Sequence, residues 1–296
     1  MRRESVFRVK DTAYVLGRRT WIMGIVNVTP DSFYDGGLYL DAGKAVAHGL
    51  ELAAEGADML DIGGESSRPG SDPTPTEDEL RRVVPVIAGL RRQSGALISV
   101  DTMKPDVAEA ALDAGADIIN DVSSFRLDPR ILELAARRKA GFIVMHMAGT
   151  PKTMQVQPRY DDVIADIRRF FAEKLEIAEA YGLDRERLMI DPGIGFGKRL
   201  EDNLALLNGL AAFEDLGRPV LLGVSRKSFI GKILNAPPED RLEGTIAASV
   251  IGVVRGAHVL RAHDVRAVKR AVLVAEAILA VNPGRPRPEE NGRYVH

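Results

Sequence analysis

The chain alternates between amphipathic segments and short apolar runs that stop at polar residues. A helix-like segment closes on a glycine, a small residue follows, and an apolar run then begins, as in Glu55-Gly-Ala-Asp-Met-Leu-Asp-Ile-Gly63. The same order returns at 114–121, 139–146 and 255–261. Glycine suits the left-handed position that ends a helix. Continuous apolar runs are typical of strands buried on both faces of a parallel sheet.

Taken together, these runs predict eight strands separated by helices. The strands are expected near 20–27, 58–62, 96–101, 116–120, 141–146, 187–191, 219–224 and 257–261. The helices are expected near 40–55, 76–94, 104–114, 129–139, 161–182, 200–213, 227–254 (broken at Pro237-Pro238) and 264–281. Eight consecutive βα units favour an α/β fold of the (β/α)8 TIM-barrel type. A doubly wound sheet is the alternative, but no G-x-G-x-x-G motif follows the first strand.

The two ends of the chain differ from this repeating part. Residues 5–16 alternate as a β-hairpin does, and we expect this hairpin to plug the amino-terminal mouth of the barrel. Residues 283–296 are polar and rich in proline, so a flexible tail is expected. The sequence shows no linker between domains, which predicts a single domain over 1–296 with its barrel at about 18–282.

Composition excludes several classes of function. The 296 residues include no cysteine, which rules out disulfides, cysteine-bound metals and thiol nucleophiles. A net charge of −2 and an aromatic content of 5% give no reason to expect nucleic acid as a partner. No run approaches the ~18 apolar residues of a membrane span, and the first residues lack the apolar stretch of a signal peptide. A cytoplasmic location without membrane contact is therefore expected.

Polar residues follow nearly every predicted strand, where the active sites of barrels are built. Asn27 ends the first strand, and the loop after it is too long for a simple βα turn. The second strand leads into another long loop, which holds Ser67, Arg68 and Pro69. Both segments are either surface loops or lids over a site. Arg68 is a natural clamp for an anion if it is not simply solvated.

Three further strand ends offer hydrogen-bond acceptors, namely Asp101, Asn120 and Asp191. Each could cap the helix that follows it. Because all three would point into one mouth, they suggest instead a heterocycle whose amino and ring N–H groups need acceptors.

The last two strands bring positive charge to the same mouth. Lys227 and Ser228 stand where a helix begins, a position that favours anions. Arg261 and His263 are two residues apart and would share one face of the last strand. Barrels often bind phosphate on this side. No pair of histidines has zinc-binding spacing, whereas Asn27 together with a pyrophosphate could hold Mg²⁺.

These residues fall within stretches by which the chain resembles bacterial dihydropteroate synthases over about 20–280. The matching stretches are Asn27-Val-Thr-Pro-Asp-Ser-Phe33, Asp61-Ile-Gly-Gly-Glu-Ser-Ser-Arg-Pro-Gly70, Val100-Asp-Thr102, Ile119-Asn-Asp-Val122, Met145-His-Met-Ala-Gly-Thr-Pro151, Asp191-Pro-Gly-Ile-Gly-Phe-Gly-Lys198, Ser225-Arg-Lys-Ser228 and Arg261-Ala-His-Asp-Val265. One piece alone is a weak signal. Their presence together, in order and at successive strand ends, makes the resemblance specific.

The resemblance implies a transferase of alkyl or aryl groups other than methyl in folate biosynthesis. It would join 4-aminobenzoate to 6-hydroxymethyl-7,8-dihydropterin diphosphate and release pyrophosphate. By the resemblance, the pterin edge would be bound by Asp101, Asn120, Asp191 and Lys227, with Arg261 on its face. The pyrophosphate would be held by Asn27, Arg68, Arg261 and His263, with Mg²⁺ at Asn27. The aminobenzoate pocket, where sulfonamides compete, would be formed by Ser67, Arg68, Pro69, Phe196, Lys227 and Ser228. Met145 is counted among the substrate-binding residues, and a homodimer formed through helices at about 240–280 is implied.

One position departs from the family pattern, because Ser67 stands where the family often has threonine. The hydroxyl is kept, so we expect little effect on activity and at most a slight shift in aminobenzoate or sulfonamide affinity. Two other functions share part of this pattern. A pterin-dependent methyltransferase would not need the cluster of basic groups suited to pyrophosphate. An inactive pterin-binding paralogue would be expected to have lost part of that cluster.

Overall fold

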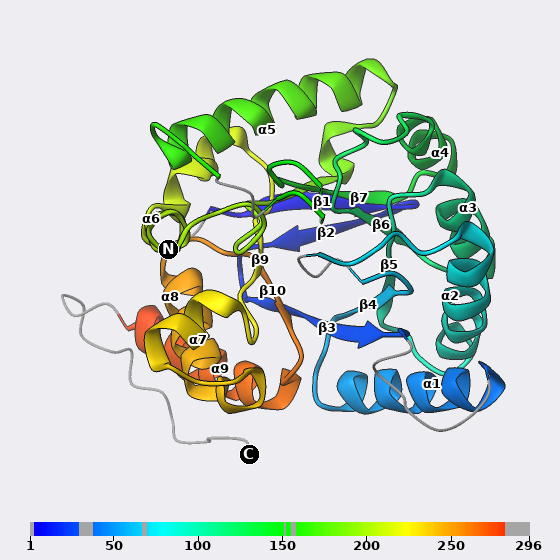
Figure 1. The fold of residues 1–296 in the computed structure, drawn as a ribbon, viewed down its shortest axis with the longest axis horizontal. Coiled ribbons are helices and arrows are strands. Elements are labelled where there is room, and N and C mark those ends of the chain that lie inside the picture. Colours follow the sequence, from blue (N-terminus) through cyan, green and yellow to red (C-terminus); the bar gives the residue numbers. More distant parts are fainter. Residues whose placement is uncertain (1–2, 30–37, 67–69, 151, 155–157, 282–296) are drawn as a thin grey trace, which may run out of the picture.

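The computed structural model describes residues 3–29, 38–66, 70–150, 152–154 and 158–281. In this part of the chain, eight parallel strands form a nearly closed barrel with helices around it (Figure 1). The hydrogen-bonded order is β8-β7-β6-β5-β4-β3-β10-β9, and a parallel bridge between Ile190 and Val220 brings the two outer strands together. The predicted TIM barrel is confirmed, and the alternative of a doubly wound sheet is wrong.

Every predicted strand and helix has a counterpart. The barrel strands are β3 (Trp21–Asn27), β4 (Met59–Gly63), β5 (Leu97–Asp101), β6 (Ile118–Asp121), β7 (Gly141–Met145), β8 (Leu188–Asp191), β9 (Leu221–Gly223) and β10 (Val259–Ala262). The helices are α1 (Leu38–Ala54), α2 (Thr76–Arg91), α3 (Pro105–Ala114), α4 (Arg130–Arg138), α5 (Val163–Ala180), α6 (Leu200–Asn208), α7 (Ser228–Leu234), α8 (Leu242–Val254) and α9 (Val265–Ala280). Among the residues described, no helix is both long enough and apolar enough to cross a membrane.

The predicted break in the seventh helix is confirmed. Helix α7 ends at Leu234, and Asn235 follows in the left-handed conformation with φ 53°. Pro237 and Pro238 then lead into a short 3₁₀ turn before α8 begins at Leu242. Proline lacks the backbone N–H that a continuous helix would need here. The sixth helical segment also divides, because α6 ends at Asn208 and a 3₁₀ helix covers Leu210–Leu216.

The alternation of side chains along each strand gives the barrel its two layers of core. In β4, Leu60 and Ile62 belong to the large cluster between strands and helices, whereas Met59 belongs to a smaller cluster with inward-facing residues of the other strands. Successive strand residues point to opposite faces, so Asp61 shares the inner face with Met59. The barrel interior is therefore apolar where the strands begin and polar where they end.

The amino-terminal hairpin closes the apolar end. Strands β1 (Ser5–Val9) and β2 (Thr12–Leu16) pair antiparallel, and Phe7, Val9 and Leu16 are buried in the inner cluster at the start of the barrel strands. Burial of each such side chain contributes on the order of 1.5–3 kcal/mol. Gly141 makes this packing possible, because a Cβ there would lie 2.7 Å from the Phe7 ring. The predicted plug is thus confirmed.

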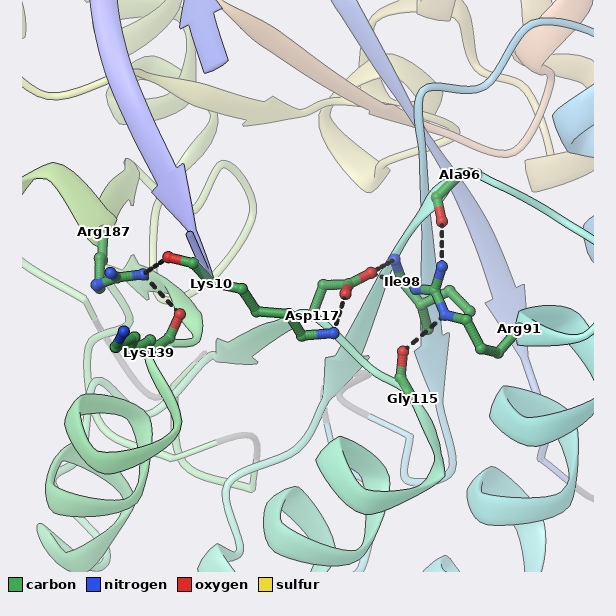
Figure 2. A network of polar contacts seen from close by, with 8 residues as sticks. All are labelled: Lys10, Arg91, Ala96, Ile98, Gly115, Asp117, Lys139 and Arg187. Carbon is green, nitrogen blue, oxygen red and sulfur yellow. Dashed lines mark hydrogen bonds and ion pairs between the residues drawn. The ribbon is translucent and has the colours of Figure 1, made fainter. Parts of the chain in front are cut away.

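A polar network ties the hairpin to the barrel (Figure 2). Asp117, which is buried before β6, accepts a hydrogen bond of 2.6 Å from Lys10 Nζ and also pairs with Arg91. Arg187 donates to the carbonyl oxygens of Lys10 at 3.0 Å and of Lys139 at 2.6 Å. The turn between β1 and β2 is therefore held both by its apolar side chains and by buried charges.

Candidate active site

A cluster of four polar side chains occupies the inner face of the barrel near the carboxyl ends of its strands. Arg261 Nε donates to Asp61 Oδ2 at 2.6 Å, and its terminal nitrogen donates to Asp101 Oδ2 at 3.1 Å. Asn120 Nδ2 donates to the same Asp61 oxygen at 3.1 Å. Asp61 is fully buried, whereas the side chains of Arg261 and Asp101 are 22% and 13% exposed. Solvent therefore reaches the cluster at Arg261 and Asp101.

The pairing of the strands explains why these residues meet. In the parallel register, Gly63 lies beside Asp101, and Asp101 lies beside Asn120. Because side chains alternate along a strand, Asp61, Asp101 and Asn120 face the interior from three neighbouring strands. Arg261 reaches them from β10, on the other side of β3.

The charges in this cluster oppose one another. Burial and the neighbouring Asp61 carboxylate raise the pKa of Asp101 to about 8, although the Arg261 guanidinium lowers it. The carboxylates in turn raise the pKa of Arg261 against the effect of its burial. Two buried carboxylates thus share one guanidinium, and near neutral pH Asp101 can hold a proton and donate a hydrogen bond.

Asp61 is not among the predicted site residues, although it begins one of the stretches that carry the family resemblance. Its signal was present in the sequence. Asp61 is a charged residue inside an otherwise apolar strand, and charged residues are almost never fully buried unless they are paired. Its alternation with Met59 and Gly63 also places it on the inner face. Charged residues inside the apolar strands, as well as those at the strand ends, therefore indicate the site.

A second group lies at the end of β8 and includes the predicted Asp191, Phe196 and Lys227. Asp191 is buried and accepts a hydrogen bond of 2.7 Å from the backbone N–H of Gly193. Lys227 Nζ lies 4.5 Å from the centre of the Phe196 ring and donates to the carbonyl oxygen of Ile194. Burial raises the pKa of Asp191 and lowers that of Lys227 to about 8, while their opposite charges act against both shifts.

The ends of β9 and β10 form a third group. Ser225 Oγ and His263 Nδ1 are 2.9 Å apart, and the backbone N–H of His263 also donates to Ser225 Oγ at 3.2 Å. Ser228 begins α7 and is exposed. The two loops after these strands are joined further by the ion pair of Arg226 with Asp264. The predicted His263 and Ser228 therefore stand at the same end of the barrel as Arg261.

The other predicted residues divide into described and undescribed ones. Asn27 ends β3, is partly buried, and shares its inner face with Met23 by alternation. Met145 is buried in a small apolar cluster against which Phe196 packs. Ser67, Arg68 and Pro69 lie outside the described residues, as does the segment 30–37 of the first long loop. The predicted tail over 283–296 lies outside them too.

Comparisons with known proteins identify the family of the chain. The profile of a family described as "Pterin binding enzyme" matches residues 23–263. The dihydropteroate synthase of Escherichia coli K12 is 45% identical to the chain over 273 residues, which is 92% of the chain and 94% of that enzyme. The family match therefore runs from within β3 to just beyond the end of β10.

Solved structures extend the match to three dimensions. A dihydropteroate synthase of Xanthomonas albilineans with 4-aminobenzoic acid has a TM-score of 0.88 and 47% identity, covering 95% of the chain and 100% of that protein. The Yersinia pestis enzyme in a sulfonamide drug complex has a TM-score of 0.85 and 42% identity, covering 90% and 98%. The chain therefore belongs to the pterin-binding enzymes and, within them, to the dihydropteroate synthases.

Proposed function

We propose that this barrel joins 4-aminobenzoate to 6-hydroxymethyl-7,8-dihydropterin diphosphate, which yields 7,8-dihydropteroate and pyrophosphate. The observation that carries the proposal is the inward-facing group of Arg261 between Asp61 and Asp101, with Asn120 beside them, in a chain of this family. The reaction transfers an alkyl group to an aniline nitrogen, so the enzyme is an alkyl transferase. The cluster and the neighbouring basic groups supply what each part of these substrates needs.

The pterin is the part that suits the central cluster. Asp101, Asn120 and Asp191 offer acceptors to its amino and ring N–H groups, and Lys227 lies close enough to Asp191 to affect its pKa. The buried Oδ1 atom of Asp61 has no hydrogen-bond partner among the described residues, and a buried acceptor of this kind is costly unless a ligand or water satisfies it. Both hydrogen bonds of Arg261 use the edge of its planar group, which leaves a face for stacking on the pterin ring.

The pyrophosphate suits the basic side of the mouth. Asn27, Arg68, Arg261 and His263 would hold it, and Ser225 orients the His263 ring. The described part of the chain brings together no group of three or more carboxylates or histidines for a metal. Mg²⁺ fits nonetheless, because it commonly takes one or two protein oxygens and completes its shell with phosphates and water. Asn27 offers one such oxygen, and the bound ion would neutralise charge on the leaving group.

The aminobenzoate would lie beside the β8 and β9 loops. Phe196 and Met145 provide apolar contact, and Lys227 and Ser228 stand where its carboxylate can be met. Ser67, Arg68 and Pro69 would complete this pocket. Sulfonamides resemble aminobenzoate in shape and charge, so we expect them to compete at the same place.

The chemistry needs positioning and charge neutralisation more than proton transfer. The C–O bond to the diphosphate breaks as the leaving group is stabilised, and the electron-rich pterin spreads the positive charge that develops on its methylene carbon. The aniline nitrogen then attacks that carbon and loses its proton. An aniline is a weak nucleophile, so its orientation contributes most. We assign no general base.

A pyrophosphate-release assay tests the proposal. Purified protein with the pterin diphosphate, 4-aminobenzoate and Mg²⁺ should release pyrophosphate and form dihydropteroate, detected by mass spectrometry. Folded protein that releases no pyrophosphate in an aminobenzoate-dependent way would refute it. Pterin binding without turnover would point instead to an inactive paralogue. Pyrophosphate release that is the same with and without aminobenzoate would indicate hydrolysis of the pterin diphosphate rather than synthesis.

The proposal includes a homodimer formed through the late helices. Helix α9 exposes Val274 and Ile278 at helical spacing, Val281 is exposed just after it, and α8 exposes Ile251 and Val254. Exposed apolar side chains repeated along packed helices are typical of protein–protein contacts. Light scattering should give twice the mass of the chain, and Ile278→Glu should give the monomer. The expected cytoplasmic location is a further part of the proposal, which cell fractionation followed by the activity assay tests.

A further inference from the structure

Lys198 is buried, although it belongs to none of the three groups of the active site. Its Nζ atom lies 3.0 Å from His146 Nδ1 and donates to the carbonyl oxygens of Gly193 at 2.9 Å, Phe196 at 3.0 Å and His146 at 3.3 Å. Carbonyl oxygens can only accept, so Lys198 Nζ is the donor in these three contacts. Burial lowers the pKa of Lys198 well below its ordinary value, and the imidazole nitrogen accepts or donates according to the tautomer of the ring.

The histidine can supply an acceptor to Lys198. Burial, followed by the charges of Lys198 and Arg126, lowers the pKa of His146 to about 2, so its ring is neutral. In the tautomer protonated at Nε2, Nδ1 carries the lone pair that accepts from Lys198. The ring is held edge-on against Phe170, with centroids 4.8 Å apart, and lies 6.0 Å from the Tyr160 ring. Lys198 thus has a fixed acceptor on the β7 side of the barrel.

These contacts join two loops that flank the predicted aminobenzoate pocket. The loop after β8 lies so close to the end of β7 that a Cβ on Gly193 would be 2.0 Å from the carbonyl oxygen of His146. Tyr160 Oη donates to the carbonyl oxygen of Gly197 at 2.8 Å, and Asn203 accepts from the N–H of Gly195 at 2.6 Å. The loop is therefore shaped by side chains from behind, with Lys198 at the centre.

Phe196 is the member of this loop that faces the substrate pocket. Its backbone carbonyl accepts from Lys198, while its ring packs against the cluster of Met145 and under Lys227 Nζ. We propose that Lys198, anchored on His146, is a positioning residue that holds Phe196 in place and so sets the affinity for the aminobenzoate substrate. The inference rests on the proposed function, since it assumes that Phe196 contacts that substrate.

The proposal predicts an effect on one substrate only. Asp191 accepts from the backbone N–H of Gly193, whereas Lys198 donates to the carbonyl oxygen on the other side of that residue. Loss of the Nζ atom would therefore release the Phe196 carbonyl and keep the hydrogen bond to Asp191. In Lys198→Met, which has a similar length and no charge, we expect the KM for 4-aminobenzoate to rise about tenfold, or about 1.4 kcal/mol. The KM for the pterin diphosphate and kcat should change less than threefold.

Steady-state kinetics with each substrate varied in turn tests this, with thermal unfolding to confirm the fold. Lys232→Met is the matched control, because Lys232 is exposed on α7 and the same charge is removed. An inactive wild-type enzyme would refute the proposed function. An active wild type with an unchanged aminobenzoate KM in Lys198→Met would refute the inference alone. Equal losses for both substrates, or a fall in kcat only, would also overturn it.

A second pair of variants decides the matter if Lys198→Met does not fold. His146→Gln can offer an amide oxygen to Lys198, whereas His146→Leu cannot. The inference requires a raised aminobenzoate KM in His146→Leu and a value near that of the wild type in His146→Gln. Equal KM values in the two variants would overturn it.

Discussion

Arg261→Met is the sharpest test of the central cluster. Arg261 is the cation between Asp61 and Asp101, to which it donates hydrogen bonds of 2.6 Å and 3.1 Å. Methionine fills a similar length and leaves the buried Asp61 carboxylate, and the Asp101 carboxyl group beside it, without their partner. Breaking a buried ion pair by removing one partner typically costs about 3–5 kcal/mol. We expect a loss of this size in the free energy of unfolding at neutral pH, together with the loss of pterin diphosphate binding.

The same variant should become more sensitive to alkaline pH. A carboxylate whose pKa is higher in the folded protein than in the unfolded chain loses stability as pH rises between the two values, and no further above the folded one. In the wild type this loss ends near pH 8, the pKa of Asp101. Without the guanidinium that lowers it, this pKa moves above 8. Each pH unit over which the variant alone continues to lose stability is worth about 1.36 kcal/mol. The difference in free energy of unfolding between Arg261→Met and the wild type should therefore be larger at pH 9 than at pH 6 by up to about 1.4 kcal/mol.

Urea unfolding of both proteins at pH 6 and pH 9 measures this difference, and calorimetry with the pterin diphosphate measures binding. Arg226→Met is the matched control, because Arg226 pairs with Asp264 in a more exposed place, with side chains 39% and 21% exposed. Exposed pairs are typically worth about 0–1 kcal/mol. The reasoning is wrong if Arg261→Met loses no more stability than Arg226→Met, if its deficit is the same at both pH values, or if pterin binding is unchanged.

Three further predictions concern the neighbouring groups. Because burial lowers the pKa of Lys227 to about 8, its charge is lost above that value, and the KM for 4-aminobenzoate measured from pH 6.5 to 9.5 should rise on the alkaline side; a flat profile would exclude Lys227 from binding the carboxylate. Asp191→Asn keeps an oxygen for the N–H of Gly193, so thermal stability should be nearly unchanged while calorimetry shows pterin affinity about tenfold lower; unchanged affinity would remove Asp191 from the pterin site. Gly193→Ala combines a φ of +64° with a clash against the His146 carbonyl, whereas Gly182→Ala has a φ of +83° and open space. Urea unfolding should therefore show a loss of about 2 kcal/mol or more for the first and about 1 kcal/mol for the second, and equal losses would mean that the close contact is relieved.

The fold was predictable because the signal was repeated. Each barrel strand is an apolar run, and each is followed by a helix with its own amphipathic pattern, so the eight units support one another. The same repeated pattern locates the ends of the strands, where polar residues indicate the site. Asp101, Asn120 and Asp191 lie where the strands are expected to stop. The extra strength of the prediction came from the order of the family stretches along the chain.

The contacts inside the barrel were not predictable in this way. Asp61 and Arg261 are 200 residues apart in sequence, and no local pattern relates them. They meet because closure of the barrel brings β10 beside β3 and leaves β4 next in line. The role of Lys198 was hidden for a different reason. A lysine after a glycine-rich turn looks like a solvated residue, and only the folded loop shows that it is buried among carbonyl oxygens.

The hairpin plug affects how substrates enter the barrel and how products leave it. Phe7, Val9 and Leu16 fill the amino-terminal end of the barrel, so two substrates and two products must share the opposite doorway. Pyrophosphate and dihydropteroate then leave by the route along which the next substrates arrive. A product that has not yet dissociated blocks the entry of the next substrate. The turnover rate therefore depends on product release through this one opening as well as on the chemical step.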